Sequence, residues 1–194
     1  LFMAECGYSV IIFMPDQNNI FHDLPVGKNA PEEVNVIIEI SEGSRVKYEF
    51  EKEHGFIMVD RFLHTPIPYP FSYGLIPRTW NDFDHDPLDA IVISSEPIFP
   101  GAVVSTRVIG MLSVNDSGER DDKILTVPTC DPYFSEVKRF EDLPPKKRED
   151  IEYFLTHYKD LEADKEVQVT SWDDAPTAKA FIDECIEVYK QKFA

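Results

Sequence analysis

The sequence predicts a mainly β fold, in which a barrel-like core of strands is followed by two packing helices. Short runs of apolar and β-branched residues, separated by turn residues, fill most of the chain before residue 128. In the last third, the spacing of apolar residues changes to that of helices. With 194 residues, of which 43% are hydrophobic, the chain is long enough to bury one core, so we expect a single domain over residues 1–194.

Six segments carry the strand pattern, and residues that favour turns separate many of them. They are residues 34–40, 45–51, 56–63, 88–94, 102–114 and 123–127. Glycines mark several of the turns, at Gly43, Gly55, Gly101 and Gly118. We therefore expect the barrel-like core to come from the first two thirds of the chain.

Helical spacing appears twice after residue 144. The apolar residues that recur at this spacing are Ile151, Phe154, Leu155 and Tyr158 in the first segment, and Ala178, Phe181, Cys185 and Tyr189 in the second. Pro144 and Pro145 fit the start of the first helix. Asp173 or Asp174, which precede Pro176, fit as the cap of the second helix.

Composition narrows the classes of partner and compartment. The formal net charge of −17, from 36 acidic and 19 basic residues, disfavours binding to nucleic acid or to anionic membranes. Cys6, Cys130 and Cys185 are widely spaced, which favours a reducing, cytoplasmic compartment over a disulfide framework or a zinc site. The apolar start of the chain is too short to span a bilayer, and the first basic residue is Lys28. We interpret residues 1–20 as an N-terminal arm with no assigned role.

An acidic stretch, D-F-D-H-D-P-L-D at residues 82–89, runs directly into the apolar segment 90–93. Carboxylates about 4 Å apart repel one another by roughly 4 kcal/mol per pair at an effective dielectric constant near 20, so we expect a cation among them. Hard divalent cations such as Mg²⁺, Mn²⁺ and Ca²⁺ prefer oxygen ligands. A calcium-binding EF-hand loop that starts at Asp82 is excluded, because Pro87 replaces its glycine and Ile93 its glutamate. A solvated acidic loop is the remaining structural alternative.

Four charged residues share a strand face with apolar neighbours, which predicts that they are partly buried. They are Glu39, Arg61, Asp89 and Lys123. An unpaired buried charge is too costly to be incidental. A network of salt bridges would explain each of them, and a polar pocket at the mouth of the barrel would explain all four together.

Two further groups carry chemistry. Asp116 and Asp121 lie five residues apart across a turn that contains glycine, and Lys123 follows on the same strand face as Asp121. Tyr69 and Tyr73 lie in a segment fixed by prolines and glycine. Their hydroxyl groups would donate hydrogen bonds either within the core or to phosphate oxygens.

Seven segments in this order resemble the family I soluble inorganic pyrophosphatases. They are I-I-E-I at 37–40, V-K-Y-E at 46–49, V-D-R-F at 59–62, Y-P-F-S-Y-G at 69–74, D-H-D-P-L-D at 84–89, D-S-G-E-R-D-D-K at 116–123 and H-Y-K-D-L-E at 157–162. The match extends from about residue 24 to residue 190, which is most of the chain. The resemblance implies a five-stranded OB-like closed barrel with two C-terminal helices, and Mg²⁺-dependent hydrolysis of pyrophosphate to two phosphates.

The resemblance also implies roles for individual residues. The metal ligands would be Asp84, Asp89, Asp116 and Asp121. The phosphate oxygens would be bound by Lys47, Arg61, Tyr73, Lys123, Tyr158 and Lys159. Asp86 would accept the proton of the attacking nucleophile, and Glu39, Glu49 and Tyr69 would support the site. Several Mg²⁺ ions would bind, with Mn²⁺, Zn²⁺ or Co²⁺ as substitutes, and the chain would form a homo-oligomer, commonly a hexamer in bacterial members.

The sequence departs from the family pattern at His85, where a small residue or Asp or Asn is usual, and at Ser72, where Asn is common. We choose Asp121 over its neighbour Asp122 because Asp121 keeps the five-residue spacing from Asp116. Two alternative functions are weighed. A D-x-D phosphomonoesterase would need a helix-rich α/β pattern, which is missing, and a non-catalytic β-module that binds divalent metal would leave the lysines, arginine and tyrosines unexplained.

Overall fold

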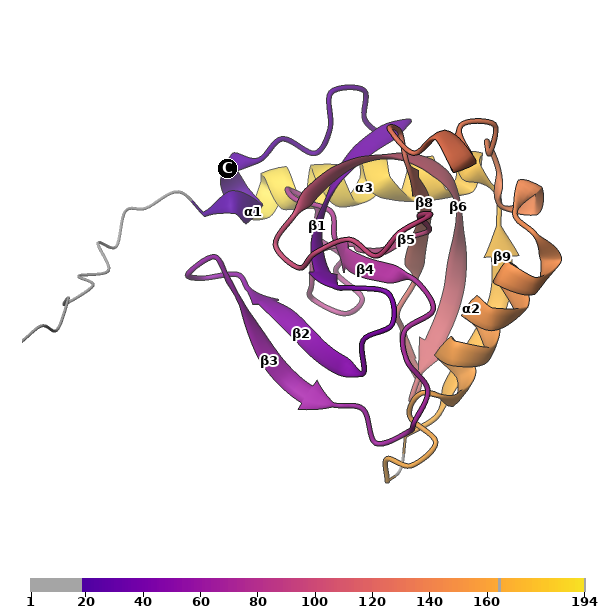
Figure 1. The fold of residues 1–194 in the computed structure, drawn as a ribbon. Coiled ribbons are helices and arrows are strands. Elements are labelled where there is room, and N and C mark those ends of the chain that lie inside the picture. Colours follow the sequence, from indigo (N-terminus) through magenta and orange to yellow (C-terminus); the bar gives the residue numbers. More distant parts are fainter. Residues whose placement is uncertain (1–18, 164, 194) are drawn as a thin grey trace, which may run out of the picture.

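The computed structural model describes residues 19–163 and 165–193, and its centre is a closed ring of five strands (Figure 1). In order around the ring these are β1 (Glu33–Ile40), β4 (Ser72–Leu75), β5 (Asp89–Val92), β8 (Lys123–Pro128) and β6 (Val103–Asp116). Pairing of β6 with β1 closes the ring. The predicted mainly β fold with an OB-like barrel is confirmed. Of the predicted N-terminal arm, residues 1–18 lie outside the described residues.

Two of the six predicted strands lie outside the ring. Within the part of the chain that the structure describes, β2 (Val46–Glu51) and β3 (Phe56–Phe62) pair only with each other, in a separate two-stranded sheet (Figure 1). The expected buried row of β3 is only partly present, because the side chain of Val59 is 49% exposed while that of Leu63 is buried. A strand pattern gives the period of a segment but not the sheet that it joins. The place in the ring belongs instead to the short β4, which was not among the predicted strands.

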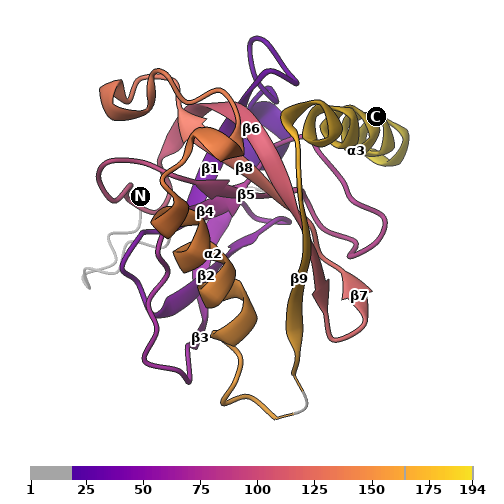
Figure 2. The same cartoon turned by 90° about the vertical axis from the view of Figure 1, so that its right-hand side faces the viewer.

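Three helices and further short elements complete the described chain. They are α1 (Ile20–Asp23), α2 (Pro145–His157), α3 (Ala175–Phe193), β7 (Glu119–Arg120), β9 (Val167–Asp173) and the 3₁₀ helices Pro132–Phe134 and Phe140–Asp142. The two predicted helices are α2 and α3, and the backbone N–H of Thr177 donates to Asp174 over 3.0 Å, so Asp174 is the cap. β9 extends the sheet by pairing with β6 and runs beside α2 (Figure 2). No helix in these ranges is long and apolar enough to cross a membrane.

The ring has two apolar faces, each covered by one helix. Ile91 and Leu125 belong to the cluster that α2 completes, whereas Ile124 belongs to the cluster that α3 completes. Successive residues of a strand face opposite sides, so the two clusters alternate along β5 and β8. Asp89 and Lys123 begin the rows that face α2, and they are register partners in the parallel β5–β8 pair. The alternation therefore places both charged side chains on the α2 side, at one end of the barrel.

Gly74 lies where β4 approaches β1 most closely. A Cβ atom at this position would lie 2.0 Å from the carbonyl oxygen of Ile37, which no real side chain tolerates. Because the neighbouring atoms belong to the backbone of the ring, they cannot move aside without disturbing the β1–β4 pairing. Closure of the ring thus depends on glycine here.

We expect Gly74→Ala to lower the free energy of unfolding by about 3 kcal/mol, the upper end of the usual cost of overpacking. The control is Gly43→Ala, because an added Cβ there meets open space and the cost, about 1 kcal/mol, comes only from its φ of +86°. Urea unfolding measures the loss of stability in both variants. Equal losses in the two variants would contradict the close approach.

Candidate active site

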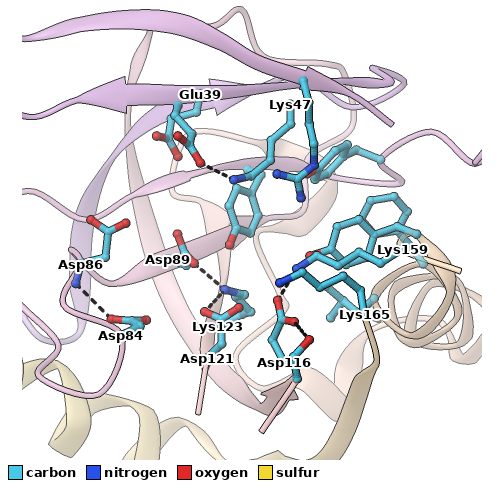
Figure 3. A pocket seen from close by; sticks show the side chains of 18 of the residues that line it. Glu39, Lys47, Asp84, Asp86, Asp89, Asp116, Asp121, Lys123, Lys159 and Lys165 are labelled. Carbon is cyan, nitrogen blue, oxygen red and sulfur yellow. Dashed lines mark hydrogen bonds and ion pairs between the residues drawn. The ribbon is translucent and has the colours of Figure 1, made fainter. Parts of the chain in front are cut away.

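A polar cavity of about 460 Å³ opens at the end of the barrel, between the ring, the β2–β3 hairpin and α2 (Figure 3). All of the site residues predicted from the sequence line it: Glu39, Lys47, Glu49, Arg61, Tyr69, Tyr73, Asp84, Asp86, Asp89, Asp116, Asp121, Lys123, Tyr158 and Lys159. Segments far apart in the sequence therefore meet in one place. Tyr48, Ser117, Glu119, Phe154, Leu155 and Lys165 complete the lining.

Three of the carboxylates lie at or next to the ends of ring strands. Asp89 is the first residue of β5, Asp116 is the last of β6, and Asp121 comes two residues before β8 begins at Lys123. Because β5 and β8 are parallel and in register at Asp89 and Lys123, their first residues meet at the same edge of the sheet. The sheet thus gathers acidic groups without using a long loop for each.

Two lysines lie among these carboxylates and pair with them. The ammonium group of Lys123 pairs with both Asp89 and Asp121, and that of Lys159 pairs with Asp116 (Figure 3). Burial lowers the pKa of Lys123, but the two aspartates raise it by more, so the net pKa lies well above its usual value and the group stays charged. These lysines neutralise part of the acidic cluster in the protein without metal.

The 81–86 loop brings two further carboxylates. Burial, together with the charges of Asp89 and Asp121, raises the pKa of Asp84 to about 7. Burial also raises the pKa of Asp86, although its ion pair with Lys52 opposes the change. The backbone N–H of Asp86 donates to Asp84 Oδ1 over 3.1 Å, which fixes the two residues relative to each other. Both groups are thus in an environment that favours a proton or a cation.

Glu39 lies deepest among the acidic groups, with 8% of its surface exposed. Burial first and the charge of Asp89 second raise its pKa to about 8, against the effect of a hydrogen bond of 2.7 Å from the backbone N–H of Phe50. In the absence of a metal, Glu39 therefore keeps its proton at neutral pH.

The cavity lining also offers cations and hydroxyl groups. Lys47 and Arg61 are register partners in the β2–β3 hairpin, so both side chains extend from the same face. Burial raises the pKa of Tyr69, Tyr73 and Tyr158 well above the usual value, which keeps their hydroxyl groups protonated and able to donate. These groups are suited to oxygen atoms that carry negative charge.

Several residues of this site escaped the sequence analysis. Asp60 Oδ2 lies 2.7 Å from Arg61 Nη1, and Glu162 Oε1 lies 3.4 Å from Arg61 Nε, so both carboxylates orient the guanidinium group. Lys52 and Lys165 add positive charge. Asp60 and Glu162 stand inside the motifs V-D-R-F and H-Y-K-D-L-E, which was the available signal, whereas nothing local marks the two lysines.

The departures from the family pattern have a structural context. His85 adopts a φ of +59°, a left-handed conformation that Gly, Asn and Asp adopt most easily. Asp122 faces away from the cavity and is buried against Arg120, whereas Asp121 lines the cavity. A separate group lies at the hairpin turn, outside the cavity. It is formed by Glu51, Glu53 and His54, whose potential metal-ligand atoms lie within 4.8 Å of one another.

The donor set of the cavity fits hard divalent metals. Its acidic residues offer carboxylate oxygens only, which Mg²⁺ and similar ions prefer. The pKa of Asp84, raised to about 7 by burial and by neighbouring carboxylates, shows that the cluster lacks positive charge even with Lys123 in place. Divalent cations bound there would supply it.

Comparison with known proteins agrees with this geometry. The family described as inorganic pyrophosphatase matches residues 36–190. The chain belongs to the inorganic pyrophosphatase family. The inorganic pyrophosphatase of Aquifex pyrophilus is 47% identical over 173 residues, covering 88% of this chain and 97% of that protein. That of Haloferax volcanii is 38% identical over 176 residues, covering 91% and 99%.

Solved structures show the same fold. The crystal structure of the inorganic pyrophosphatase from Thermus thermophilus has a TM-score of 0.85 at 39% identity, covering 89% of this chain and 99% of that chain. Membership of this family implies dependence on a divalent metal, in agreement with the carboxylate cluster.

The raised pKa of Glu39 predicts a pH dependence of stability in chelator. Between its unperturbed pKa of 4.5 and about 8, the folded protein keeps a proton that the unfolded chain has lost, so the free energy of unfolding falls as the pH rises. One proton corresponds to about 1.4 kcal/mol per pH unit. We expect Glu39→Gln, which retains an acceptor for Phe50, to make this fall shallower by up to that slope. Denaturant unfolding at a series of pH values measures this slope. The control Glu96→Gln, at an exposed position, should show the same slope as the wild type.

Proposed function

We propose that this protein hydrolyses inorganic pyrophosphate to two phosphates, with Mg²⁺ as its metal. The observation that carries the proposal is a single cavity lined both by carboxylates and by cationic and hydroxyl groups. The carboxylates suit metal ions, and the cationic and hydroxyl groups suit phosphate oxygens. Pyrophosphate is a compact polyanion whose charge bound metal and these cations would offset.

The metal would be held by Asp84, Asp89, Asp116 and Asp121, with Glu39 and Glu49 beside them. When bound, Mg²⁺ lowers the pKa of water from 15.7 toward about 7 and neutralises phosphate charge. The all-oxygen donor set favours Mg²⁺, with Mn²⁺, Zn²⁺ or Co²⁺ as substitutes. Lys123 and Lys159 pair with three of these aspartates and would turn toward phosphate oxygens when metal is present.

Asp86 is the proposed proton acceptor. The attacking water forms a new O–P bond, its proton passes to the carboxylate of Asp86, and the bridging P–O bond breaks to release phosphate. The raised pKa of Asp86 makes it a better base than an exposed aspartate. Its ion pair with Lys52 opposes this rise and favours the ionised form that can accept the proton.

The remaining residues position the substrate. Arg61 would bind phosphate through paired N–H donors, and Asp60 and Glu162 hold its guanidinium group in place. Lys47, Lys123 and Lys159 would act as point charges, and Tyr73 and Tyr158 as neutral donors, with Tyr69 in a supporting place. Positioning and charge stabilisation supply most of the rate enhancement in phosphoryl transfer.

The proposal also covers the domain organisation, the compartment and the assembly of the chain. Residues 1–194 would form a single pyrophosphatase domain that works in the cytoplasm, which agrees with Cys130 and Cys185 both being free thiols. It would assemble as a homo-oligomer, specifically a hexamer. Exposed aromatic side chains such as Phe99 and Tyr133, at 80% and 83% exposure, support self-association.

We expect phosphate release from pyrophosphate in the presence of Mg²⁺, none in excess chelator, and at least about 100-fold less from a phosphomonoester. The last expectation follows because both phosphoryl groups of the substrate are needed to engage the bound metal and the cationic side chains together. A colorimetric assay of released phosphate tests these three expectations. Preference for the monoester would favour the phosphomonoesterase alternative, and metal binding without turnover would favour the non-catalytic module.

We expect Asp86→Asn to slow turnover by about 10²–10⁴ at saturating Mg²⁺, the usual range for loss of a general base. The matched control is Asp82→Asn, because Asp82 is exposed in the same loop but does not line the cavity. Steady-state kinetics measures both, and thermal unfolding verifies that they fold. If the two variants were equally active, Asp86 would not be the proton acceptor.

A further inference from the structure

Arg120 lies outside the cavity lining, yet it is stacked between two aromatic rings. Its Cζ atom lies 4.7 Å from the centre of the Phe83 ring and 4.9 Å from the centre of the Phe181 ring. Both distances are within the range of cation–π attraction. Phe83 is 54% exposed, so packing in the core does not hold this ring in place. Its contact with Arg120 is therefore a specific attachment.

The guanidinium group is itself anchored by a buried carboxylate. The Nε and Nη2 atoms of Arg120 each lie 2.6 Å from Oδ2 of Asp122, whose side chain is 1% exposed. The other oxygen, Oδ1, accepts a hydrogen bond of 3.2 Å from the backbone N–H of Val114 in β6. A buried carboxylate needs such partners, and the planar guanidinium fixes the direction in which its faces point.

Arg120 thereby joins three segments of the chain. Phe83 lies in the 81–86 loop beside Asp84, Arg120 itself directly precedes Asp121, and Phe181 belongs to α3. The same loop is attached to α3 at its start, where the backbone N–H of Trp80 donates to the carbonyl of Cys185 over 3.0 Å. We call Phe83, Arg120 and Phe181, with Asp122, the arginine clamp.

The 81–86 loop needs an attachment of this kind. Its own hydrogen bonds, such as those from Phe83 N–H to Asn81 and from Asp86 N–H to Asp84, each 3.1 Å long, fix its shape but not its distance from β8. Asp84 and Asp121 come from different segments, and both carboxylates line the same cavity. Without a restraint, like charges would push the loop away from the ring.

We propose that Arg120 is a positioning residue: through the arginine clamp it sets the distance between Asp84 and Asp121, and thereby the affinity of the site for divalent metal. The inference rests on the proposed function, since it assumes that these two aspartates bind metal. Arg120 itself is not among the residues that line the cavity. Its effect passes through Phe83 to the loop.

The test compares Phe83→Leu, which keeps an apolar side chain but removes the aromatic face, with Phe83→Tyr, which keeps that face. Calorimetric titration with Mg²⁺ in the absence of pyrophosphate gives the dissociation constant. We expect Phe83→Leu to raise it about three- to tenfold, as for loss of one cation–π contact, and Phe83→Tyr to stay within about twofold. The control Phe99→Leu changes an exposed ring on another segment, at 80% exposure, and should bind as the wild type does.

Arg120→Lys tests the other partner, because lysine still pairs with Asp122 but has no planar face to stack. We expect a similar loss of affinity, and no further loss when it is combined with Phe83→Leu. The control is Arg139→Lys, at an exposed arginine that pairs with Asp142 over 3.1 Å.

Amide hydrogen exchange in chelator gives an independent readout. Residues 81–86 should exchange faster in both clamp variants than in the wild type, and other segments should exchange at the wild-type rate.

The outcomes separate the two proposals. If the wild type binds Mg²⁺ and the clamp variants match it in affinity and in hydrogen exchange, the clamp is refuted while the proposed function stands. Additive losses in the double variant, or an equal loss in Phe83→Tyr, also refute it. If the wild type binds no divalent metal, the proposed function fails, and the effect of the clamp on metal affinity fails with it.

Discussion

Repulsion among carboxylates at one end of the barrel is the constraint on which the other features of the site depend. Asp84, Asp89 and Asp121 approach closely enough that burial and mutual charge raise the pKa of Asp84 to about 7. Keeping such groups together costs free energy unless cations offset their charge. The ring meets this requirement structurally, because the parallel pairing of β5 with β8 fixes the position of two of the charged residues through backbone hydrogen bonds.

The protein carries part of the compensating charge itself. Lys123 and Lys159 pair with the aspartates, and Lys52 pairs with Asp86. These ion pairs reduce the repulsion, and the long flexible side chains of Lys123 and Lys159 would allow them to turn toward phosphate oxygens if a divalent cation offset the aspartates. The same two lysines would thus stabilise the acidic cluster and bind substrate.

Much of the site was predictable from the sequence, because strand parity and motif order depend on local residues. Parity placed Asp89 and Lys123 on apolar rows, and the structure has both at the heads of rows that face α2. Pairing between distant segments was not predictable in the same way. The ion pair of Lys52 with Asp86 joins residues 34 apart in the sequence, and no local pattern marks it.

The errors in the predicted fold have a related cause. Residues 56–62 have the composition of a barrel strand, but which sheet a strand joins depends on its partners, and here β3 pairs only with β2 within the described residues. β4 escaped the prediction because its four residues, S-Y-G-L, are short and contain a glycine. Gly74 permits the close approach of β4 to β1. The residue that weakened the strand pattern in the sequence therefore also allows β4 to take its place in the ring.

The division between ring and hairpin has a functional consequence. The proposed metal ligands come mainly from the ring and the loops attached to it, where buried strands resist displacement. Lys47 and Arg61 come from a two-stranded sheet with several exposed side chains, and such hairpins have low local stability. Metal coordination needs fixed distances, whereas a substrate must enter and two products must leave. A ring that fixes the proposed metal ligands, beside a more adaptable hairpin that carries two of the proposed phosphate-binding residues, would satisfy both requirements.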